Sequence, residues 1–337
     1  MDRRKFIKIG TGAVAVGAMS GSVVLRAAEI SAENKASDDL TAGYSAASDS
    51  ASEYSTARYS SEIGEAGKKD LLVRFLGTGA ADWNGMDERG ELRRLSSVLL
   101  DNRILIDFTP SDADMLPPGF KKPDAVFYTH SHSDHYNARA AIETLHANVV
   151  YVGDTWVERA KADLAAAASG LGKSTPEVIG LAIGQRTQCG DLTITALPGN
   201  HATKDDNERP LIYLIEKGSV RVLYATDTGG IPVRAARIVG IDAHIADGKP
   251  ITGLIMEATM GIDHDEDFRI FTHSSVGTVL RTAHVLLDTG RLKAPQGQPV
   301  YLTHMARTLH GTQAQLDANL PQPLRAAYDG LEVIFRG

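Results

Sequence analysis

Cysteine is almost absent from this 337-residue chain, and so is any excess of basic charge. The single cysteine, Cys189, cannot form a disulfide within the chain. The net charge of −7 argues against a nucleic-acid-binding protein, because such proteins need a basic face that releases counterions. Arg89, Arg93 and Arg94 form one small basic cluster, which we expect on a solvated loop. The 43% hydrophobic content is enough for one large domain with a full core.

The first 28 residues have the features of a targeting segment. Arg3 and Arg4 are paired, and no charge occurs from Ile9 to Leu25. This pattern resembles a twin-arginine signal peptide over residues 1–28, which implies export by the twin-arginine machinery to the periplasm or beyond. A transmembrane anchor is the alternative, but the apolar run is short and poor in Leu and Ile, so we expect no stable membrane anchor.

Residues 29–69 have few large apolar side chains, and nine serines occur between Ser31 and Ser61. Such a segment cannot bury enough surface to offset its ordering entropy. We interpret it as a flexible Ser/Ala-rich linker that leads to a domain over residues 70–337.

A dense group of histidines follows an apolar run that is typical of a buried strand. The run is Ala125–Tyr128, and His130, His132, Asp134 and His135 come directly after it. Imidazole and carboxylate are the ligands that borderline divalent metals prefer. The first two histidines can point the same way, whereas the next two residues can face a second metal. A solvated polar turn is the alternative, but it gives no reason for three histidines.

Three further candidate ligands each stand just past a β-rich run. His201 follows the run 194–197 and a turn, Asp227 follows the run 222–226, and His304 follows the run 300–303. Singly, each could be a surface histidine or a capping aspartate. Together with the histidine motif, they predict one shared metal site.

These residues, in this order, resemble the metallo-β-lactamase superfamily over about Leu71 to Phe335. The resemblance implies an α/β fold, the αββα sandwich, with a two-metal site at the sheet edges. It implies two ligand sets joined by one bridging carboxylate: His130, His132 and His201 for the first ion, Asp134, His135 and His304 for the second, with Asp227 between them. Zinc is the expected metal, with manganese or iron as alternatives.

Further motifs are similar to the branch that holds tRNA 3′-end endonucleases and phosphoribosyl cyclic phosphodiesterases. They are Phe75–Gly79, Ile104–Asp107, Glu257–Thr259 and His273–Ser275. The resemblance implies that His273 lies beside the scissile phosphate and is oriented by Glu257. A helix-capping histidine is the alternative. The phosphoribosyl enzyme's cysteine-rich zinc loop has no counterpart, because Ala80–Gly85 stands there, so no accessory zinc is expected.

The predicted function is hydrolysis of a small cyclic or diester phosphate, with no nucleic-acid partner. Two divalent ions about 3.5–4 Å apart lower the pKa of a bridging water and clamp the attacking and leaving oxygens. Asp134 would orient the resulting hydroxide, and His273 would protonate the leaving oxygen. The alternatives are hydrolysis of a carboxylic ester, lactone or sulfate ester, or metal binding without catalysis. His264 and His310 are further candidates for the rim of the site.

The coarse pattern of the domain interleaves strands and helices, as a layered sandwich requires. We expect strands over Leu71–Leu76, Ser97–Leu100 and Ile104–Asp107, a hairpin from Leu211–Glu216 and Val220–Ala225, and helices over Asn137–His146, Trp156–Ser169 and Ser275–Leu287, the second ended by Gly170.

Overall fold

The computed structural model describes residues 67–337, apart from 243, 245–247 and 296. The predicted signal peptide and nearly all of the predicted linker lie outside the described residues. Over the residues that are described, no helix combines the length and the hydropathy needed to cross a bilayer.

The described chain forms two sheets of seven strands each. The order in the first sheet is β14 (Glu332–Phe335), β1 (Leu71–Gly77), β2 (Ser97–Leu100), β3 (Ile104–Ile106), β4 (Ala125–Phe127), β5 (Val149–Gly153) and β6 (Glu177–Leu181). The order in the second sheet is β13 (Leu324–Ala326), β12 (Val300–Thr303), β11 (Gly253–Glu257), β10 (Val220–Ala225), β9 (Leu211–Lys217), β8 (Leu192–Pro198) and β7 (Arg186–Cys189).

The two sheets pack against each other through large buried side chains, which include Phe75, Phe127, Tyr213 and Phe335. Both faces of most strands are buried, which explains why the strands are nearly continuous apolar runs. This central layer confirms the predicted sandwich.

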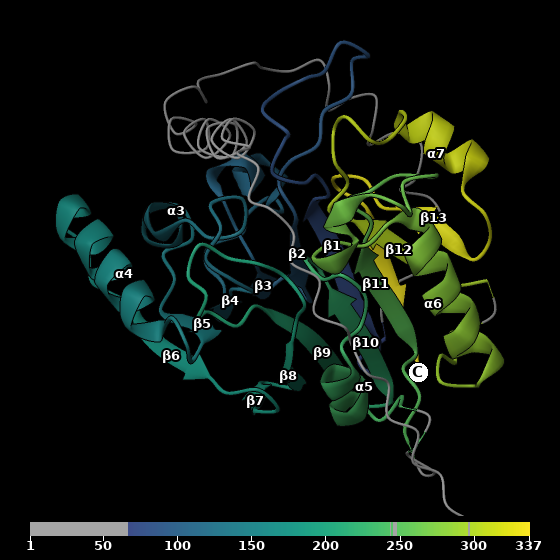
Figure 1. The fold of residues 1–337 in the computed structure, drawn as a ribbon. Coiled ribbons are helices and arrows are strands. Elements are labelled where there is room, and N and C mark those ends of the chain that lie inside the picture. Colours follow the sequence, from purple (N-terminus) through teal and green to yellow (C-terminus); the bar gives the residue numbers. More distant parts are fainter. Residues whose placement is uncertain (1–66, 243, 245–247, 296) are drawn as a thin grey trace, which may run out of the picture. The chain divides into compact units, whose positions relative to one another are not determined.

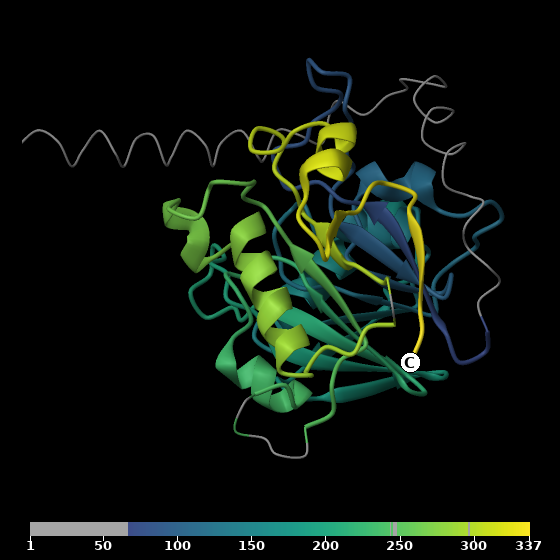
Figure 2. The same cartoon turned by 90° about the vertical axis from the view of Figure 1, so that its right-hand side faces the viewer.

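Helices cover the outer face of each sheet (Figures 1 and 2). The first sheet carries α3 (Ala138–Glu143) and α4 (Val157–Leu171), and the second carries α5 (Val233–Val239), α6 (Val276–Asp288) and α7 (Gln313–Asn319). Helix α6 shows why they pack this way. Its buried residues Val276, Val279, Ala283 and Leu286 recur on one face, as an amphipathic helix requires.

Most predicted elements are confirmed, but two helix ends differ. Helix α4 continues through Gly170 and ends at Gly172, whose φ of 63° is the left-handed conformation that favours glycine. The predicted end was therefore two residues early. Helix α3 ends at Glu143 rather than His146.

The basic cluster was predicted to lie on a solvated loop, and this prediction is wrong for Arg93. Its guanidinium is buried and donates hydrogen bonds to Thr78 Oγ1, Gln313 Oε1 and the carbonyl of Ala327 at 2.7–2.9 Å. Its hydrogen-bond partners come from distant segments of the chain, so no local sequence pattern predicts that Arg93 is buried.

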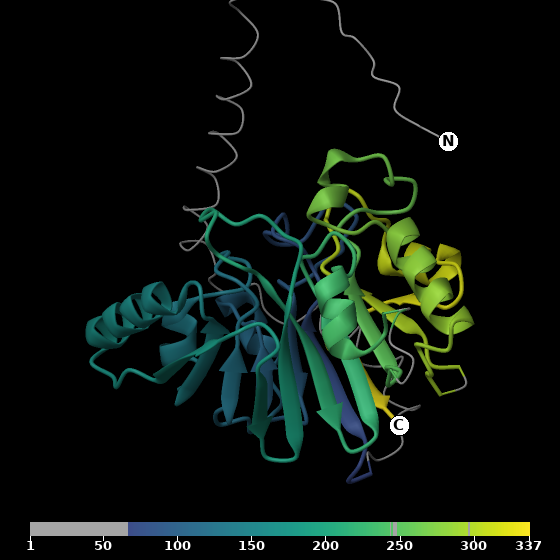
Figure 3. The ribbon, with the colours of Figure 1, turned by 60° about the horizontal axis from the view of Figure 1, so that its bottom comes forward.

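The sheet topology brings several strand ends to one edge. Strands β3 and β4 are parallel neighbours in the first sheet, and β10, β11 and β12 are parallel neighbours in the second. Strand β8 runs in the same direction as β10, because both are antiparallel to β9. Figure 3 shows the connecting loops at this edge, together with the 3₁₀ helix η2 (Phe268–Phe271). A second 3₁₀ helix, η1 (Pro110–Met115), follows β3.

Candidate metal centre

All seven predicted metal ligands lie at this edge, in two groups. Within each group, the potential ligand atoms lie within 4.8 Å of one another. The first group consists of His130, His132 and His201, and the second of Asp134, His135, Asp227 and His304. The division matches the one that the resemblance implied, and each ligand follows the carboxyl end of its strand.

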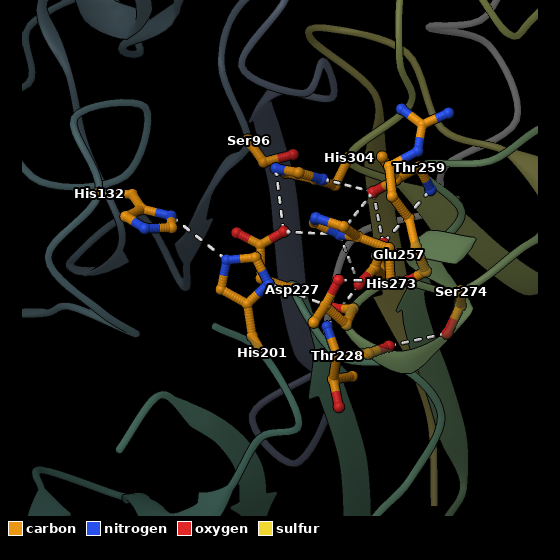
Figure 4. A network of polar contacts seen from close by, with 12 residues as sticks. Ser96, His132, His201, Asp227, Thr228, Glu257, Thr259, His273, Ser274 and His304 are labelled. Atoms are coloured by element: carbon orange, nitrogen blue, oxygen red, sulfur yellow. Dashed lines mark hydrogen bonds and ion pairs between the residues drawn. The ribbon is translucent and has the colours of Figure 1, made fainter. Parts of the chain in front are cut away.

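The first group consists of three imidazoles. His132 Nδ1 lies 3.2 Å from His201 Nε2, and both rings are visible in Figure 4. Burial lowers the pKa of His130 well below its usual range and lowers that of His132 to about 4. Both rings are therefore neutral at physiological pH, and a neutral imidazole has a free lone pair for a metal.

The second group contains the carboxylates. Asp227 Oδ2 lies 2.6 Å from His135 Nε2, and Asp227 Oδ1 lies 3.2 Å from His304 Nε2. Asp227 Oδ2 is also 3.3 Å from Nε2 of His130. Asp227 thus contacts both groups, which is the position expected of a bridging carboxylate.

The charges in the second group favour a cation. Burial alone would raise the pKa of Asp227, but His304 and His135 hold it well below its usual range. Burial likewise opposes a charge on His135, but Asp134, Asp227 and Asp107 raise its pKa well above its usual range. In the metal-free protein, a proton on His135 therefore supplies positive charge that the surrounding carboxylates require.

Two ligand atoms, His130 Nε2 and Asp227 Oδ1, are buried without a hydrogen bond, and their polar neighbours at 3.2–3.3 Å are other candidate ligands. An unsatisfied buried polar group costs about 1–3 kcal/mol, so it usually has a further role. A divalent cation would satisfy both atoms, and the set of imidazole and carboxylate donors suits zinc. The residues present therefore fit a metal centre.

The backbone is strained at two ligands that follow strands of the second sheet and at Asp107, one residue past β3 of the first sheet. Asp227 has φ 45° and His304 has φ 51°, and Asp107 at the end of β3 has φ 58°. Left-handed conformations of residues other than glycine cost about 1–3 kcal/mol and cluster at functional sites. Each turns the chain sharply just past its strand.

Four of the five histidine ligands are oriented by a second contact through the other ring nitrogen. The Nδ1 atoms of His130, His135, His201 and His304 lie 2.7–3.2 Å from, respectively, Thr129 Oγ1, Asp107 Oδ2, the Thr272 carbonyl and Thr259 Oγ1. Such contacts fix the ring and the tautomer. Asp107 belongs to one of the motifs that resemble the family, but no role was predicted for it from the sequence. Its position one residue past β3 was the available signal.

His273 lies beside the second group and contacts Glu257, the residue that the resemblance implied would orient it. His273 Nδ1 lies 3.1 Å from Glu257 Oε2 and 3.4 Å from Asp227 Oδ1 (Figure 4). Burial lowers the pKa of His273, but the Glu257 carboxylate more than offsets this and raises the pKa to about 9. The helix-capping alternative is wrong, because the side chain of Ser275 caps α6 by accepting from Thr278 N.

Glu257 also connects His273 to the ligands. Its carboxylate accepts hydrogen bonds from the backbone N–H of Thr228 and from the Thr259 hydroxyl, which also contacts His304. One buried carboxylate thus orients His273 directly and His304 through Thr259.

The two other candidate histidines lie outside the ligand groups among the described residues. His310 is buried, and its Nε2 donates to the Ala258 carbonyl at 2.6 Å, so it supports the end of β11 rather than the rim. His264 is half-buried in the loop before η2, where its carbonyl accepts from Asp267 N.

Comparison with known proteins places this geometry in a family. A family model described as "Beta-lactamase superfamily domain" matches residues 102–305. No curated protein sequence matches the chain.

Several solved structures share the fold. The metallo-β-lactamase fold protein YhfI from Bacillus subtilis has a TM-score of 0.55 at 19% identity, over 79% of this chain and 100% of that one. The short form of human tRNase Z has a TM-score of 0.56 at 15% identity, over 79% and 100%. Zn²⁺-bound PqqB from Methylobacterium extorquens has a TM-score of 0.54 at 14% identity, over 78% and 99%. With the αββα sandwich and the clustered ligands, the family match shows that this chain belongs to the β-lactamase superfamily and has the metallo-β-lactamase fold.

Proposed function

We propose that this protein is an exported two-metal phosphodiesterase that hydrolyses a small cyclic or diester phosphate. The observation that carries the proposal is the His273–Glu257 pair beside the ligand groups. When the leaving group of a phosphodiester is an alkoxide, it is a poor leaving group and needs a proton as the P–O bond breaks. An aryl sulfate, whose leaving group is a phenolate, has less need of a protonated histidine in this position.

The two ligand groups would each hold one ion, most simply Zn²⁺, with Asp227 between them. Bound there, divalent ions stabilise charge on a phosphoryl oxygen and supply a nucleophile at neutral pH. The similar PqqB structure holds Zn²⁺, which supports zinc as the metal for this donor set.

His273 would donate its proton to the leaving oxygen. Its contacts with Glu257, Thr259 and Asp227 all use Nδ1, so Nε2 is the atom that would carry the transferred proton. Glu257 keeps the ring protonated and fixes its orientation. The side chain of Asp134, 12% exposed, would accept a hydrogen bond from the attacking water and orient it.

A small substrate agrees with the composition better than a nucleic acid does. One similar structure is a tRNase Z, but this chain carries a net charge of −7, and Arg93 of its small basic cluster is buried in hydrogen bonds inside the protein. The arginine pair at the N-terminus supports export, which would take the enzyme away from tRNA.

A substrate panel tests this proposal. Metal-loaded protein would be assayed against bis-p-nitrophenyl phosphate, cyclic nucleoside monophosphates, lactones and aryl sulfates, with Asp227→Ala as the inactive control. We expect kcat/KM to be higher for the phosphodiesters than for the lactones and the aryl sulfates. Faster turnover of a lactone or an aryl sulfate would instead assign the same scaffold to another ester class.

A further inference from the structure

A buried carboxylate, that of Glu208, contacts the segment that carries two of the three clustered histidines. The side chain of Glu208 has no exposed surface. Its Oε1 accepts from the backbone N–H of Ser131 at 2.8 Å, and its Oε2 accepts from the Ser131 hydroxyl at 2.6 Å and from Arg159 Nη2 at 3.0 Å. This carboxylate is therefore held by Ser131, which lies in the metal-binding loop, and by the guanidinium of Arg159.

The position of Ser131 makes these contacts significant, because it separates the ligands His130 and His132. A residue between two ligands that is bound through both its main chain and its side chain cannot rotate freely. The spacing and direction of the two imidazoles then depend on Glu208.

Glu208 and the third ligand, His201, belong to the same loop between β8 and β9. The loop is closed at its base, where Gly199 N donates to the Pro210 carbonyl at 2.8 Å. It is joined to the other ligand loop by the bond from Leu211 N to the Thr129 carbonyl, also 2.8 Å. The loop between β8 and β9 thus contributes the ligand His201 and also binds the segment that contributes the ligands His130 and His132.

The charge of Glu208 is balanced from α4. Arg159 is 41% exposed on its side chain, and its guanidinium lies 5.4 Å from the centre of the Trp156 ring. A buried carboxylate is tolerated only with a charged or hydrogen-bonding partner, and Arg159 and Ser131 together provide both.

The second ligand group has other supports. Asp107 contacts His135 directly, and it also holds Thr129, which contacts His130, so it serves both groups. Thr259 and Glu257 support His304. Glu208 contacts none of these residues through its carboxylate. We infer that Glu208 is a positioning residue that sets the affinity of the His130, His132 and His201 group for its ion, independently of the other group. This inference rests on the proposed two-metal centre.

Calorimetric titration with Zn²⁺ tests it. Metal-free wild-type protein would be compared with Glu208→Ala, Glu208→Gln and, as a control, Glu216→Gln. Glu216 is a carboxylate on β9 that pairs with Arg186 and Arg221, away from the ligands. Loss of an outer contact typically weakens metal binding about 10–100-fold, so Glu208→Ala should lose that much at one of two sites. The Gln variant keeps an acceptor for Ser131 and should recover part of the loss, whereas the control should match wild type.

Two further variants locate the effect. His304→Ala removes a ligand of the second group. Adding Glu208→Ala to this variant should lower the affinity for the one ion that remains. Ser131→Ala should lower the affinity for Zn²⁺ slightly. In the Glu208→Ala background it should cause no further loss of affinity if both residues act through the same contact.

Several outcomes would overturn the inference. The first is that Glu208→Ala binds Zn²⁺ with wild-type affinity at both sites, and the second is that its affinity falls equally at both sites. The third is that metal-free Glu208→Ala has a circular dichroism spectrum unlike that of the wild-type protein. Fewer than two ions in the wild-type protein would instead contradict the two-metal proposal. Glu208 would then be judged by whether its removal weakens the ion that is bound.

Discussion

Asp227 is in contact with both ligand groups, and this distinguishes it from the other ligands. Its Oδ2 lies 3.3 Å from His130 Nε2 and 2.6 Å from His135 Nε2. We predict that Asp227→Ala weakens both ions, whereas His304→Ala spares the three-histidine group. Zinc content after dialysis, measured by atomic absorption, should be near zero ions per chain for the first variant and near one for the second. Equal zinc content in the two variants would contradict a bridging role.

His273 has the position of a proton donor, with Nδ1 held by Glu257 at 3.1 Å. General acid catalysis contributes about 10²–10⁴-fold, so His273→Ala should lower kcat by that factor for alkyl phosphodiesters. The loss should shrink for nitrophenyl esters, whose leaving group needs no proton. Zinc content should be unchanged, and His284→Ala, an exposed histidine on α6, should behave as wild type. Equal losses for good and poor leaving groups would indicate that His273 binds phosphate instead.

At the scale of elements, the loop after β10 packs directly against the segment that contains η2. A Cβ on Gly229 would lie 2.6 Å from the carbonyl oxygen of Ile270 and 2.7 Å from the carbonyl carbon of Phe271. These are backbone atoms, so the whole segment would have to move. That segment leads to Thr272, whose carbonyl contacts His201, and to His273.

Gly229→Ala should therefore reduce activity as well as stability. Overpacking costs about 1–3 kcal/mol of unfolding free energy, and a misplacement of about 1 Å can cost 10²-fold in rate. Gly170→Ala is the control, because a Cβ there meets no atom within 4 Å and the residue lies inside α4. It should leave activity unchanged and raise stability by about 0.5–1 kcal/mol. Thermal unfolding and kcat/KM measure both effects. Wild-type kinetics in Gly229→Ala would mean that this packing does not position the site.

The candidate ligands could be predicted from the sequence because each combines a ligand type with a strand end. His201, Asp227 and His304 each follow an apolar run and a change in pattern, and the topology then brings those ends to one edge. Local patterns also predicted the strands β1 to β4, β9 and β10 and the helices α3, α4 and α6, although α3 and α4 end at other residues than predicted. They could not distinguish Gly170 from Gly172 as the end of α4, since only the backbone conformation separates the two.

Residues whose role depends on distant partners were missed. Glu208 stands in the middle of a loop, and its burial depends on Arg159 and Ser131, which are far away in the sequence. Arg93 is buried because Gln313 and Ala327 surround it from the other end of the chain. No periodicity or motif encodes such contacts, which exist only after the two sheets have packed.

At the scale of the whole molecule, metal binding should contribute to stability. A ligand that binds only the native state at a hundred times its Kd adds about 2.7 kcal/mol. At ~2–4 °C per kcal/mol for a domain of this size, a chelator should lower the Tm by roughly 5–10 °C for each ion removed. Differential scanning calorimetry with and without chelator measures this. Asp227→Ala should show almost no such shift, and a chelator-insensitive Tm in wild type would argue against bound ions.

The proposed export of the whole chain can also be tested. Changing Arg3 and Arg4 together to Lys should leave precursor in the cytoplasm, because the twin-arginine machinery recognises the arginine pair. Cell fractionation and immunoblotting would show the distribution. Mature protein in the periplasm of the double variant would disprove the twin-arginine prediction.

The ligands come from both halves of the sandwich. Four follow β4 of the first sheet, and three follow strands of the second. An ion held by both is a cross-link between the halves, in a chain whose one cysteine allows no internal disulfide. Unlike a disulfide, it acts on the native state and not on the unfolded chain, and it forms and breaks with the free metal concentration. Resistance to proteolysis should therefore follow the supply of metal, so that a metal-starved environment both inactivates the protein and marks it for degradation.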